Sequence, residues 1–357
     1  MWPNKNLLEQ LGIQIPIVQS PMAGVSDVDM ALAVNRAGGL GSLPGAMKSV
    51  QQLEQDLERL ITQSNTPVNL NFFCHEPKPE SASELAHWQG VLQPFYDELS
   101  AEVPGQTGPG RMPFGEDQCA LVESCRPRIV SFHFGLPATP LLDRVKAAGC
   151  VVLGSATTVV EARWLEANGC DVVIAQGSEA GGHRGMFLTQ DVATQMGSLS
   201  LVPQVVDAVS VPVIAAGGIG DGRGIAAAFA LGASAVQIGT AYITCRQSLA
   251  SPLYVRALKE VDVATALTNV FSGKPARGIV NRVMSELGGM TTDAPSFPHA
   301  GAAIAPLRKL AEAEGRVDFS SHWSGQSAAL VPDEDDAEQL TLRLAEDAMR
   351  IMKKLGT

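Results

Sequence analysis

The sequence predicts an α/β protein built on a (β/α)8 barrel, with an inserted substrate-capping subdomain after the eighth strand. Eight short apolar runs rich in Val and Ile recur along the chain without in/out alternation, which is typical of parallel strands buried on both faces. Helical patterns lie between most of these runs. A chain of 357 residues has room for one barrel of ~250 residues plus ~100 residues of insertions. An open doubly wound sheet is the alternative, but it would need fewer strands or a visible switch in strand order.

The predicted strands are separated by helices whose ends carry recognisable signals. Gly38, Gly149, Gly169 and Gly232 each stand just before a strand, as expected of glycines that end helices. Thr158 and Glu161 have the spacing of a capping box. The eight strands are predicted over residues 15–21, 39–45, 68–73, 129–135, 150–156, 171–177, 211–218 and 235–240.

A further helix start is predicted at Thr139-Pro140, where Thr139 would be the N-cap and Pro140 would occupy the first turn. The last segment of the chain begins acidic and ends with two lysines, so its charges match a helix dipole. Its apolar residues recur at helical spacing, which predicts a closing helix that packs on the barrel through one face. That face would carry Leu340, Leu344, Ile351 and Leu355.

Two stretches are too long to be ordinary βα loops of ~2–6 residues. The first separates the third and fourth strands and contains a Pro/Gly-rich passage at 102–117, and the second follows the eighth strand. We expect them to form a lid or a capping subdomain. The predicted organisation is therefore a barrel over 1–244 with an insertion at 74–128, a substrate-capping insert over 245–326, and a closing C-terminal helix over 327–357.

Composition and charge exclude several functional classes. Lys and Arg number 26 against 37 Asp and Glu, a net charge of −11 without any basic tract, which argues against a nucleic-acid partner. No apolar stretch reaches the ~20 residues that span a bilayer, and the first residues do not resemble a signal peptide. The six cysteines are scattered without a metal-ligand pattern, so core thiols such as Cys150 and Cys170, in a cytoplasmic protein without a bound metal, are expected.

Glycine-rich turns after the seventh and eighth strands predict a phosphate site. In barrel enzymes the C-terminal ends of these strands commonly hold phosphate, and glycines let backbone N–H groups approach an anion. Asp221 can cap the helix that follows, and Thr240 can add a hydroxyl donor. Two ordinary turns are the alternative, but their pairing at these two strands favours a phosphate. The predicted contacts are Gly217, Gly218, Gly239 and Thr240.

Other predicted strand ends carry amides and histidines. Asn71, Gln176 and Gln237 each offer a donor and an acceptor, as a heteroaromatic ring requires. Gly220 and the glycines after it match the dinucleotide-binding pattern only weakly, so a mononucleotide is favoured over a dinucleotide. His183, in the loop after the sixth strand, is the first candidate for proton transfer, and His133, at the end of the fourth strand, is the second.

Segments from both ends of the chain resemble the nitronate monooxygenases, formerly called 2-nitropropane dioxygenases. They appear in family order and they coincide with the polar strand ends described above. The matching segments are PIVQSPMAG (16–24), AGGLGSLPG (37–45), NLNFF (69–73), SFHFG (131–135), AQGSEAGGHRG (175–185), VPVIAAGGI (211–219), GASAVQIGTAY (232–242), KPARG (274–278) and WSGQ (323–326).

The resemblance implies an FMN-dependent enzyme that oxidatively denitrifies alkyl nitronates of the propionate 3-nitronate type. O2 would be the oxidant, and a carbonyl compound plus nitrite or nitrate the products. His183 would be the catalytic histidine and His133 a second polar group at the substrate. An anionic substrate needs positive charge nearby, from Arg184, Lys274 or Arg277. The FMN site implied by the motifs comprises Ala23, Asn71, Gln176, Gly181, Gly217, Gly218, Gln237, Gly239 and Thr240.

The late insert departs from the pattern expected of the branch that acts on propionate 3-nitronate. That branch is expected to carry tyrosines and a lysine at helical spacing, whereas residues 296–310 here contain no tyrosine. An FMN-dependent enoyl-acyl-carrier-protein reductase, an NAD(P)H:quinone reductase and a flavin-binding sensor without catalysis are therefore kept as alternatives. A homodimer formed through an insert surface is also compatible with the sequence.

Overall fold

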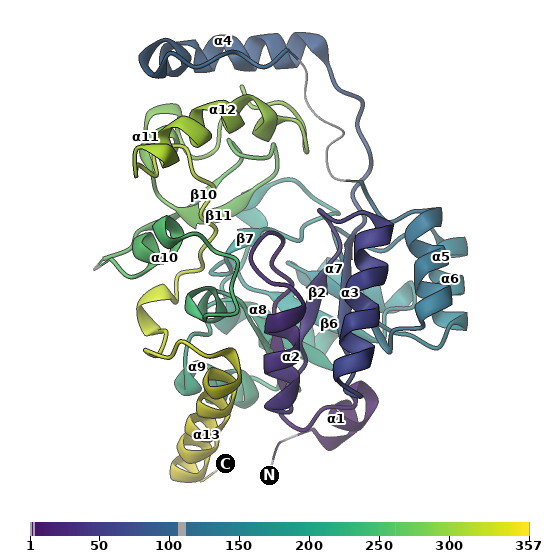
Figure 1. The fold of residues 1–357 in the computed structure, drawn as a ribbon. Coiled ribbons are helices and arrows are strands. Elements are labelled where there is room, and N and C mark those ends of the chain that lie inside the picture. Colours follow the sequence, from purple (N-terminus) through teal and green to yellow (C-terminus); the bar gives the residue numbers. More distant parts are fainter. Residues whose placement is uncertain (1, 3, 106–111, 261, 357) are drawn as a thin grey trace.

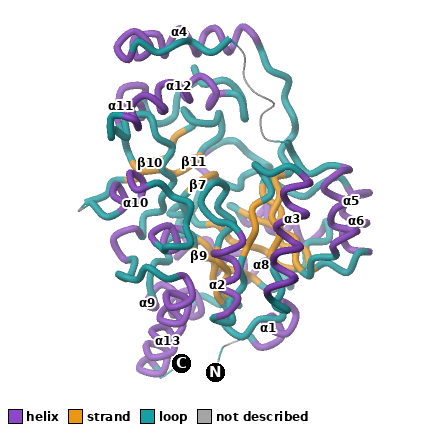
Figure 2. The backbone as a smooth tube through the Cα atoms, in the orientation of Figure 1, coloured by secondary structure: helices purple, strands orange, loops and turns teal. Residues whose placement is uncertain are grey.

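The computed structural model describes residues 2, 4–105, 112–260 and 262–356 and is built around one sheet of eight parallel strands (Figures 1 and 2). All eight predicted strands are present in it. Their order in the sheet is β1-β9-β8-β6-β5-β4-β3-β2. The strands are β1 (Ile17–Gln19), β2 (Ser42–Pro44), β3 (Asn69–Phe73), β4 (Ile129–His133), β5 (Val151–Ala156), β6 (Val172–Gln176), β8 (Val213–Ala216) and β9 (Ala235–Ile238).

The sheet closes on itself between its first and last members. Leu40, just before β2, donates its N–H to the carbonyl of Ile17 in β1 at 2.9 Å and accepts from the N–H of Gln19 at 2.9 Å. This parallel bridge completes the circuit, so the predicted (β/α)8 barrel is confirmed. Helix α1 (Lys5–Leu11) plugs one end, because Leu7 and Leu11 are fully buried in one cluster with residues of the barrel strands.

Helices surround the barrel, and α13 packs against both α9 and α2 and completes the ring. In this closing helix Leu340 and Leu344 are buried, as predicted, but Leu355 lies in the last turn and is 69% exposed. Met352 is buried in its place. The surrounding helices are α2 (Val28–Arg36), α3 (Val50–Gln63), α5 (Glu116–Cys125), α6 (Thr139–Ala147), α7 (Val159–Ala167), α8 (Ser198–Ala208), α9 (Gly222–Ala230) and α13 (Ala337–Leu355).

The predicted helix ends are mostly correct. Gly38, Gly149, Gly169 and Gly232 all have φ between 90° and 93°, which is the left-handed conformation of a C-terminal glycine. Thr158 is the N-cap of α7, since its side chain accepts from the N–H of Glu161. Thr139 is not an N-cap. Helix α6 begins at Thr139 itself, and its cap residue is Ala138. Proline lacks an N–H group and is tolerated throughout the first turn, so Pro140 does not fix which residue is the cap.

The two long stretches meet above the barrel (Figures 1 and 2). Helix α4, from the first stretch, packs against α12, from the second. Trp88 Nε1 donates to the carbonyl of Ala300 at 3.2 Å, and Tyr96 Oη donates to that of Ala303 at 2.5 Å. Part of the Pro/Gly-rich passage, residues 106–111, lies outside the described residues. The helices of this upper region are α4 (Ala82–Leu99), α10 (Pro252–Leu258), α11 (Arg282–Leu287) and α12 (Ala300–Ala313).

A small antiparallel sheet joins this upper region to the barrel. Its strands β10 (Thr265–Thr268) and β11 (Ala276–Ile279) come from the second stretch, and β7 (Gly182–His183) comes from the loop after β6. The chain also forms three short 3-10 helices, η1 (Val192–Thr194), η2 (Thr240–Thr244) and η3 (Ala328–Leu330). Across the described ranges, none of the helices combines the length and the apolar character that crossing a membrane requires.

Candidate active site

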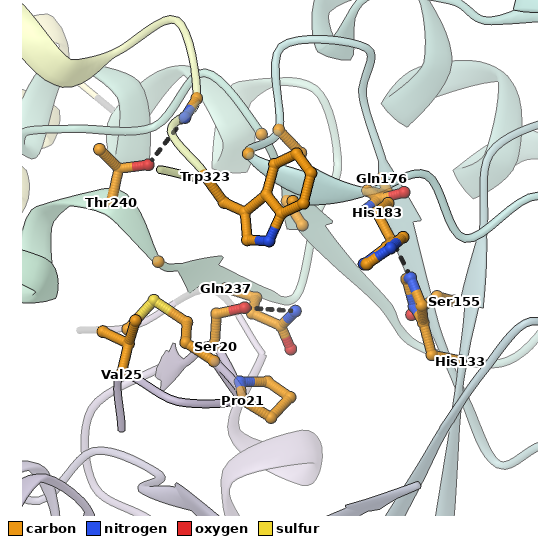
Figure 3. A pocket seen from close by; sticks show the side chains of 18 of the residues that line it. Ser20, Pro21, Val25, His133, Ser155, Gln176, His183, Gln237, Thr240 and Trp323 are labelled. Carbon is orange, nitrogen blue, oxygen red and sulfur yellow. Dashed lines mark hydrogen bonds between the residues drawn. The ribbon is translucent and has the colours of Figure 1, made fainter. Parts of the chain in front are cut away.

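A pocket opens at the C-terminal ends of the barrel strands, and every predicted catalytic and FMN-site residue lines it (Figure 3). In this view Ser20, Pro21 and Gln237 lie on one side, Trp323 on the opposite side, and His133 with His183 at one end. The pocket thus brings together residues from most of the barrel strands. The predicted residues among its lining are Ala23, Asn71, His133, Gln176, Gly181, His183, Gly217, Gly218, Gln237, Gly239 and Thr240.

The turns after β8 and β9, where the sequence predicts a phosphate cradle, both line the pocket. Gly217 and Gly218 have φ of 101° and 73°, and a Cβ on Gly217 would lie 3.0 Å from the N of Ala180. Asp221 caps α9 as predicted, since its carboxylate accepts from the N–H of Arg223 at 2.8 Å. Thr240 Oγ1 accepts from the N–H of Gly325 at 3.0 Å, so its own hydrogen can still be donated. The cradle therefore combines backbone freedom with a hydroxyl donor.

Glu179 is a lining residue that the sequence analysis missed. Its carboxylate oxygens accept from the N–H of Ser198, the first residue of α8, at 2.8 and 2.9 Å, and Ser198 Oγ lies 2.8 Å from the carbonyl of Gly217. A carboxylate at a helix N-terminus is favoured by the helix dipole. Glu179 thus fixes the loop after β6 to the loop after β8, and no sequence motif marks this contact.

The three amides predicted at strand ends have different surroundings. Asn71 Nδ2 donates to Ser131 Oγ at 2.9 Å. Gln176 uses both ends of its amide on the His183 loop: Nε2 donates to the carbonyl of His183 at 3.0 Å, and Oε1 accepts from the N–H of Gly185 at 2.8 Å. In the described part of the chain, Gln237 Oε1 is buried without a hydrogen-bond donor. Gln237 is therefore the amide best suited to receive an N–H group from a bound ring.

His183 is held by both its ring and its backbone. The ring lies with Nε2 at 2.9 Å from Ser272 Oγ, in the segment between β10 and β11. Its residue pairs with Ala276 of β11, so the small sheet fixes the backbone as well. The side chain is 9% exposed, at the wall of the pocket. The imidazole is therefore placed against the cavity with little freedom to rotate.

His133 contacts the backbone of His183. Its Nε2 lies 3.2 Å from the carbonyl oxygen of His183, which requires a proton on that nitrogen. Burial lowers the pKa of His133 to about 4, although the hydrogen bond to the His183 carbonyl acts in the opposite direction. A Cβ on Gly185 would lie 2.8 Å from His133 Cε1, so glycine is needed there. His133 is thus neutral near pH 7 and donates to the backbone of the catalytic candidate.

Two fully buried charged residues, Arg184 and Glu161, shape the same loop. Arg184 donates to the carbonyls of Gly177 at 2.6 Å and Gln176 at 2.7 Å. Burial lowers its pKa to about 10, which leaves it cationic at neutral pH. Glu161 accepts from the N–H of Phe187 at 2.7 Å and, through its other oxygen, from the N–H of Thr157 at 2.7 Å. The capping-box spacing located Glu161 but not its side-chain partners.

The remaining two predicted cations lie at different depths. Arg277 Nε donates to the carbonyl of Ser178 at 2.9 Å. Lys274 Nζ stands 4.6 Å from the ring centroid of Phe134, a cation–π contact, and burial lowers its pKa. The Phe134 ring in turn lies 6.0 Å from the ring of His183. Lys274 therefore contacts an aromatic ring, whereas Arg184 and Arg277 donate to backbone carbonyls.

Two aromatic lining residues, Trp323 and Tyr254, were also missed as site residues, although Trp323 belongs to the WSGQ segment. Across the described residues no group of three or more His, Cys, Asp or Glu side chains is arranged to hold a metal ion. The polar groups that line the pocket are imidazole, amide, hydroxyl, carboxylate, indole and backbone groups. Such groups suit an organic cofactor and a small organic substrate.

Comparison with known proteins agrees with this geometry. The family model for nitronate monooxygenase matches residues 4–347. The chain is 42% identical over 334 residues to a nitronate monooxygenase from Pseudomonas aeruginosa, covering 92% of this chain and 95% of the relative. It is 36% identical to a probable nitronate monooxygenase from Staphylococcus haemolyticus, with 99% of each chain covered.

Solved structures give the same result at the level of the fold. A nitroalkane oxidase from Streptomyces ansochromogenes superimposes with a TM-score of 0.88 and 37% identity, over 98% of this chain and 99% of that one. FabK from Thermotoga maritima is more distant, with a TM-score of 0.76 and 26% identity over 99% and 98% of the two chains. The chain belongs to the nitronate monooxygenase family.

Proposed function

We propose that the protein oxidatively denitrifies alkyl nitronates of the propionate 3-nitronate type, using O2 and releasing a carbonyl compound with nitrite or nitrate. The observation that carries this proposal is the placement of His183 at the wall of the pocket that all but one of the family segments line, the exception being KPARG (274–278). An imidazole held there by Ser272 Oγ and by β11 lies beside the substrate, and it can also accept the α-proton when the substrate is supplied as the neutral nitroalkane.

We propose FMN as the cofactor, since the residues present fit it. The glycine turns after β8 and β9 and the Thr240 hydroxyl suit a phosphate. The buried Gln237 Oε1 suits the ring N–H of an isoalloxazine. Bound there, FMN would accept electrons from the substrate and pass them to O2. Ala23, Asn71, Gln176 and Gly181 would complete its surroundings.

The chain's own residues would bind the substrate and move one proton. The neutral imidazole of His183 would accept the α-proton of a nitroalkane, and a preformed nitronate would not need this step. His133 and Gln176 would keep the imidazole in place through the His183 carbonyl. The upper region, with α4 and α12, would exclude water above the pocket, which is the capping role we propose for the 245–326 insert.

The test is oxygen uptake and nitrite release by the purified protein with propionate 3-nitronate, compared with NADH or NADPH plus a quinone or an enoyl thioester. We expect oxygen uptake and nitrite release with the nitronate. Oxidation of the nicotinamide with either acceptor, without any nitronate turnover, would instead favour a reductase. The reductase alternatives are less favoured because FabK is the more distant structural relative.

A cytoplasmic location and a homodimer remain proposals. All six cysteines are free thiols, and Cys150 and Cys170 are buried in the core as expected, which suits a reducing compartment. Leu249, Met290 and Leu310 are exposed apolar side chains on the second insert, where a second copy could pack. Light scattering of the purified protein measures the oligomeric state directly.

A further inference from the structure

We propose that Trp323 is a substrate-binding residue whose indole Nε1–H donates a hydrogen bond to an oxygen of the nitronate group. This inference rests on the proposed function, because it concerns how that site holds its anionic substrate. It goes beyond the histidine and the cofactor-binding residues, none of which supplies a side-chain N–H donor on the side of the pocket opposite Gln237. Trp323 lines the pocket but belongs to no predicted strand end.

The indole of Trp323 is oriented so that its N–H can reach a ligand in the pocket. Figure 3 shows the Trp323 side chain pointing into the pocket, with its ring nitrogen directed toward the side where Gln237 lies. Among the described residues, none accepts a hydrogen bond from this nitrogen. Trp88, by contrast, is fully buried and donates to the carbonyl of Ala300. An indole nitrogen can only donate, so Trp323 presents an available donor to whatever occupies the pocket.

The second observation is how firmly Trp323 is held. The hydroxyl of Tyr254 donates to the Trp323 carbonyl, and the Tyr254 ring stacks on His322 at 4.3 Å between centroids with an interplanar angle of 4°. An isolated bridge pairs Trp323 with Gly278. A Cβ on Gly278 would lie 3.1 Å from Trp323 Cε3, so the indole rests directly on that glycine. A donor fixed in this way loses little entropy when it binds a ligand.

The third observation is the position of the donor relative to the base. The ring centroids of Trp323 and His183 are 5.5 Å apart, so one substrate can contact both. Of the cations near the loop, Arg184 and Arg277 are engaged with backbone carbonyls, and Lys274 contacts the Phe134 ring. A nitronate carries its negative charge on two oxygens, and a neutral nitro group carries far less. The indole N–H would therefore favour the anion over the neutral compound.

The test measures anion binding without turnover. Nitrate, a planar monoanion with the same O–N–O edge as a nitronate, is titrated into the flavin-loaded protein and followed by the flavin absorbance spectrum. Trp323→Phe keeps an aromatic ring and removes the donor, and we expect its Kd for nitrate to rise by ~10- to 100-fold, the value of a hydrogen bond to a charged group. Trp2→Phe is the matched control, because Trp2 packs on Phe229 away from the pocket.

Two further readouts separate the donor from the packing of the ring. Trp323→His keeps a ring N–H and is expected to recover part of the lost affinity. In turnover, Trp323→Phe is expected to raise KM for ethyl nitronate by a factor similar to the rise in Kd, with kcat little changed, as for uniform loss of substrate binding. The ratio of flavin to protein in Trp323→Phe is expected to equal that of the unsubstituted protein.

The inference is overturned by an unchanged nitrate Kd in Trp323→Phe, by nitrate that does not bind the unsubstituted protein, or by loss of flavin from the variant, which would assign the donor to the cofactor. Failure of the proposed function looks different. If nitrate affinity depends on Trp323 but the protein does not oxidise nitronates, the role of Trp323 stands and the proposed function is wrong. If the protein oxidises nitronates but Trp323→Phe binds nitrate equally well, the proposed function stands and the role of Trp323 is wrong.

Discussion

His183 is positioned by residues that lie far from it in the sequence. Ser272 contacts its ring, and His133 and Gln176 both donate to its carbonyl oxygen. The GGH segment made His183 recognisable from the sequence, because glycines before a histidine at a strand end suggest a site. Ser272 was not predictable, since its contact depends on how β7 pairs with β11.

Replacement of His183 by Asn tests its role as a base. We expect kcat/KM for neutral nitroethane to fall by ~10²- to 10⁴-fold, the usual contribution of general base catalysis. Turnover of preformed ethyl nitronate should fall much less, because no proton has to be removed. Nitrite release with the two substrates measures the difference, with flavin content as the control. Equal losses on both substrates would assign His183 to binding instead.

The lowered pKa of His133 predicts how the stability of the protein depends on pH. Its pKa of about 4 lies below the ordinary value of 6.5, mainly because the ring is buried. The unfolded chain takes up a proton as the pH falls through 6.5, but the folded protein does so only near 4. The contribution of His133 to the free energy of unfolding is therefore fully present above pH 6.5. It is lost as the pH falls from 6.5 to 4, and the loss amounts to about 3 kcal/mol or less.

The matched variant is His133→Gln, which keeps an N–H donor for the His183 carbonyl but does not titrate. Denaturant unfolding at pH 7 and pH 5 measures the effect. We expect the free energy of unfolding to fall less in the variant than in the unsubstituted protein over this interval. An identical fall in both proteins would show that His133 is already protonated in the folded state or contributes no linkage.

At the scale of elements, the barrel strands were predictable because each is buried on both faces and therefore forms a continuous apolar run, as in β6. Strand β7 has only two residues, and helix α4 contains Pro94, so neither leaves a clear periodic pattern. The prediction that Leu355 packs on the barrel was wrong, because it lies in the last turn and is exposed. Helical periodicity does not show whether the last turn of a helix still contacts its neighbours.

The turn after β8 can be tested with a pair of glycines. Gly217 has φ of 101° and lies in the pocket, whereas Gly149 has φ of 90° at the end of α6 with open space where a Cβ would be. Replacing either by Ala should cost about 1–2 kcal/mol of stability through backbone strain. Only Gly217→Ala should also weaken FMN binding, by at least ~10-fold. Equal FMN affinity in both variants, measured by fluorescence titration of the apoprotein, would show that the turn after β8 does not hold the phosphate.

In the whole molecule, the two insertions form one structure above the pocket, although their contacts lie far apart in the sequence: Trp88 and Ala300 differ by 212 positions. Their length alone predicted capping elements, but no local pattern could predict that α4 would pack on α12. Together these helices form an apolar cluster separate from those of the barrel. Such a cluster can open without unfolding the barrel.

Hydrogen exchange tests this independence. Trp88 is fully buried between α4 and α12, and Trp88→Ala should destabilise that contact by about 3–5 kcal/mol. We expect amides of α4 and α12 to exchange faster in the variant, while those of β5 and β6 keep their protection. Faster exchange throughout the barrel strands would show that the cap and the barrel unfold as one unit.

We propose that the pocket at the C-terminal face of the barrel couples a bound flavin to nitronate oxidation. The most direct measurement is anaerobic mixing of the flavin-loaded protein with propionate 3-nitronate and, separately, with NADH or NADPH, while the flavin absorbance is recorded. We expect rapid loss of oxidised flavin absorbance with the nitronate and none with either nicotinamide. Bleaching by a nicotinamide alone, with no response to the nitronate, would contradict it.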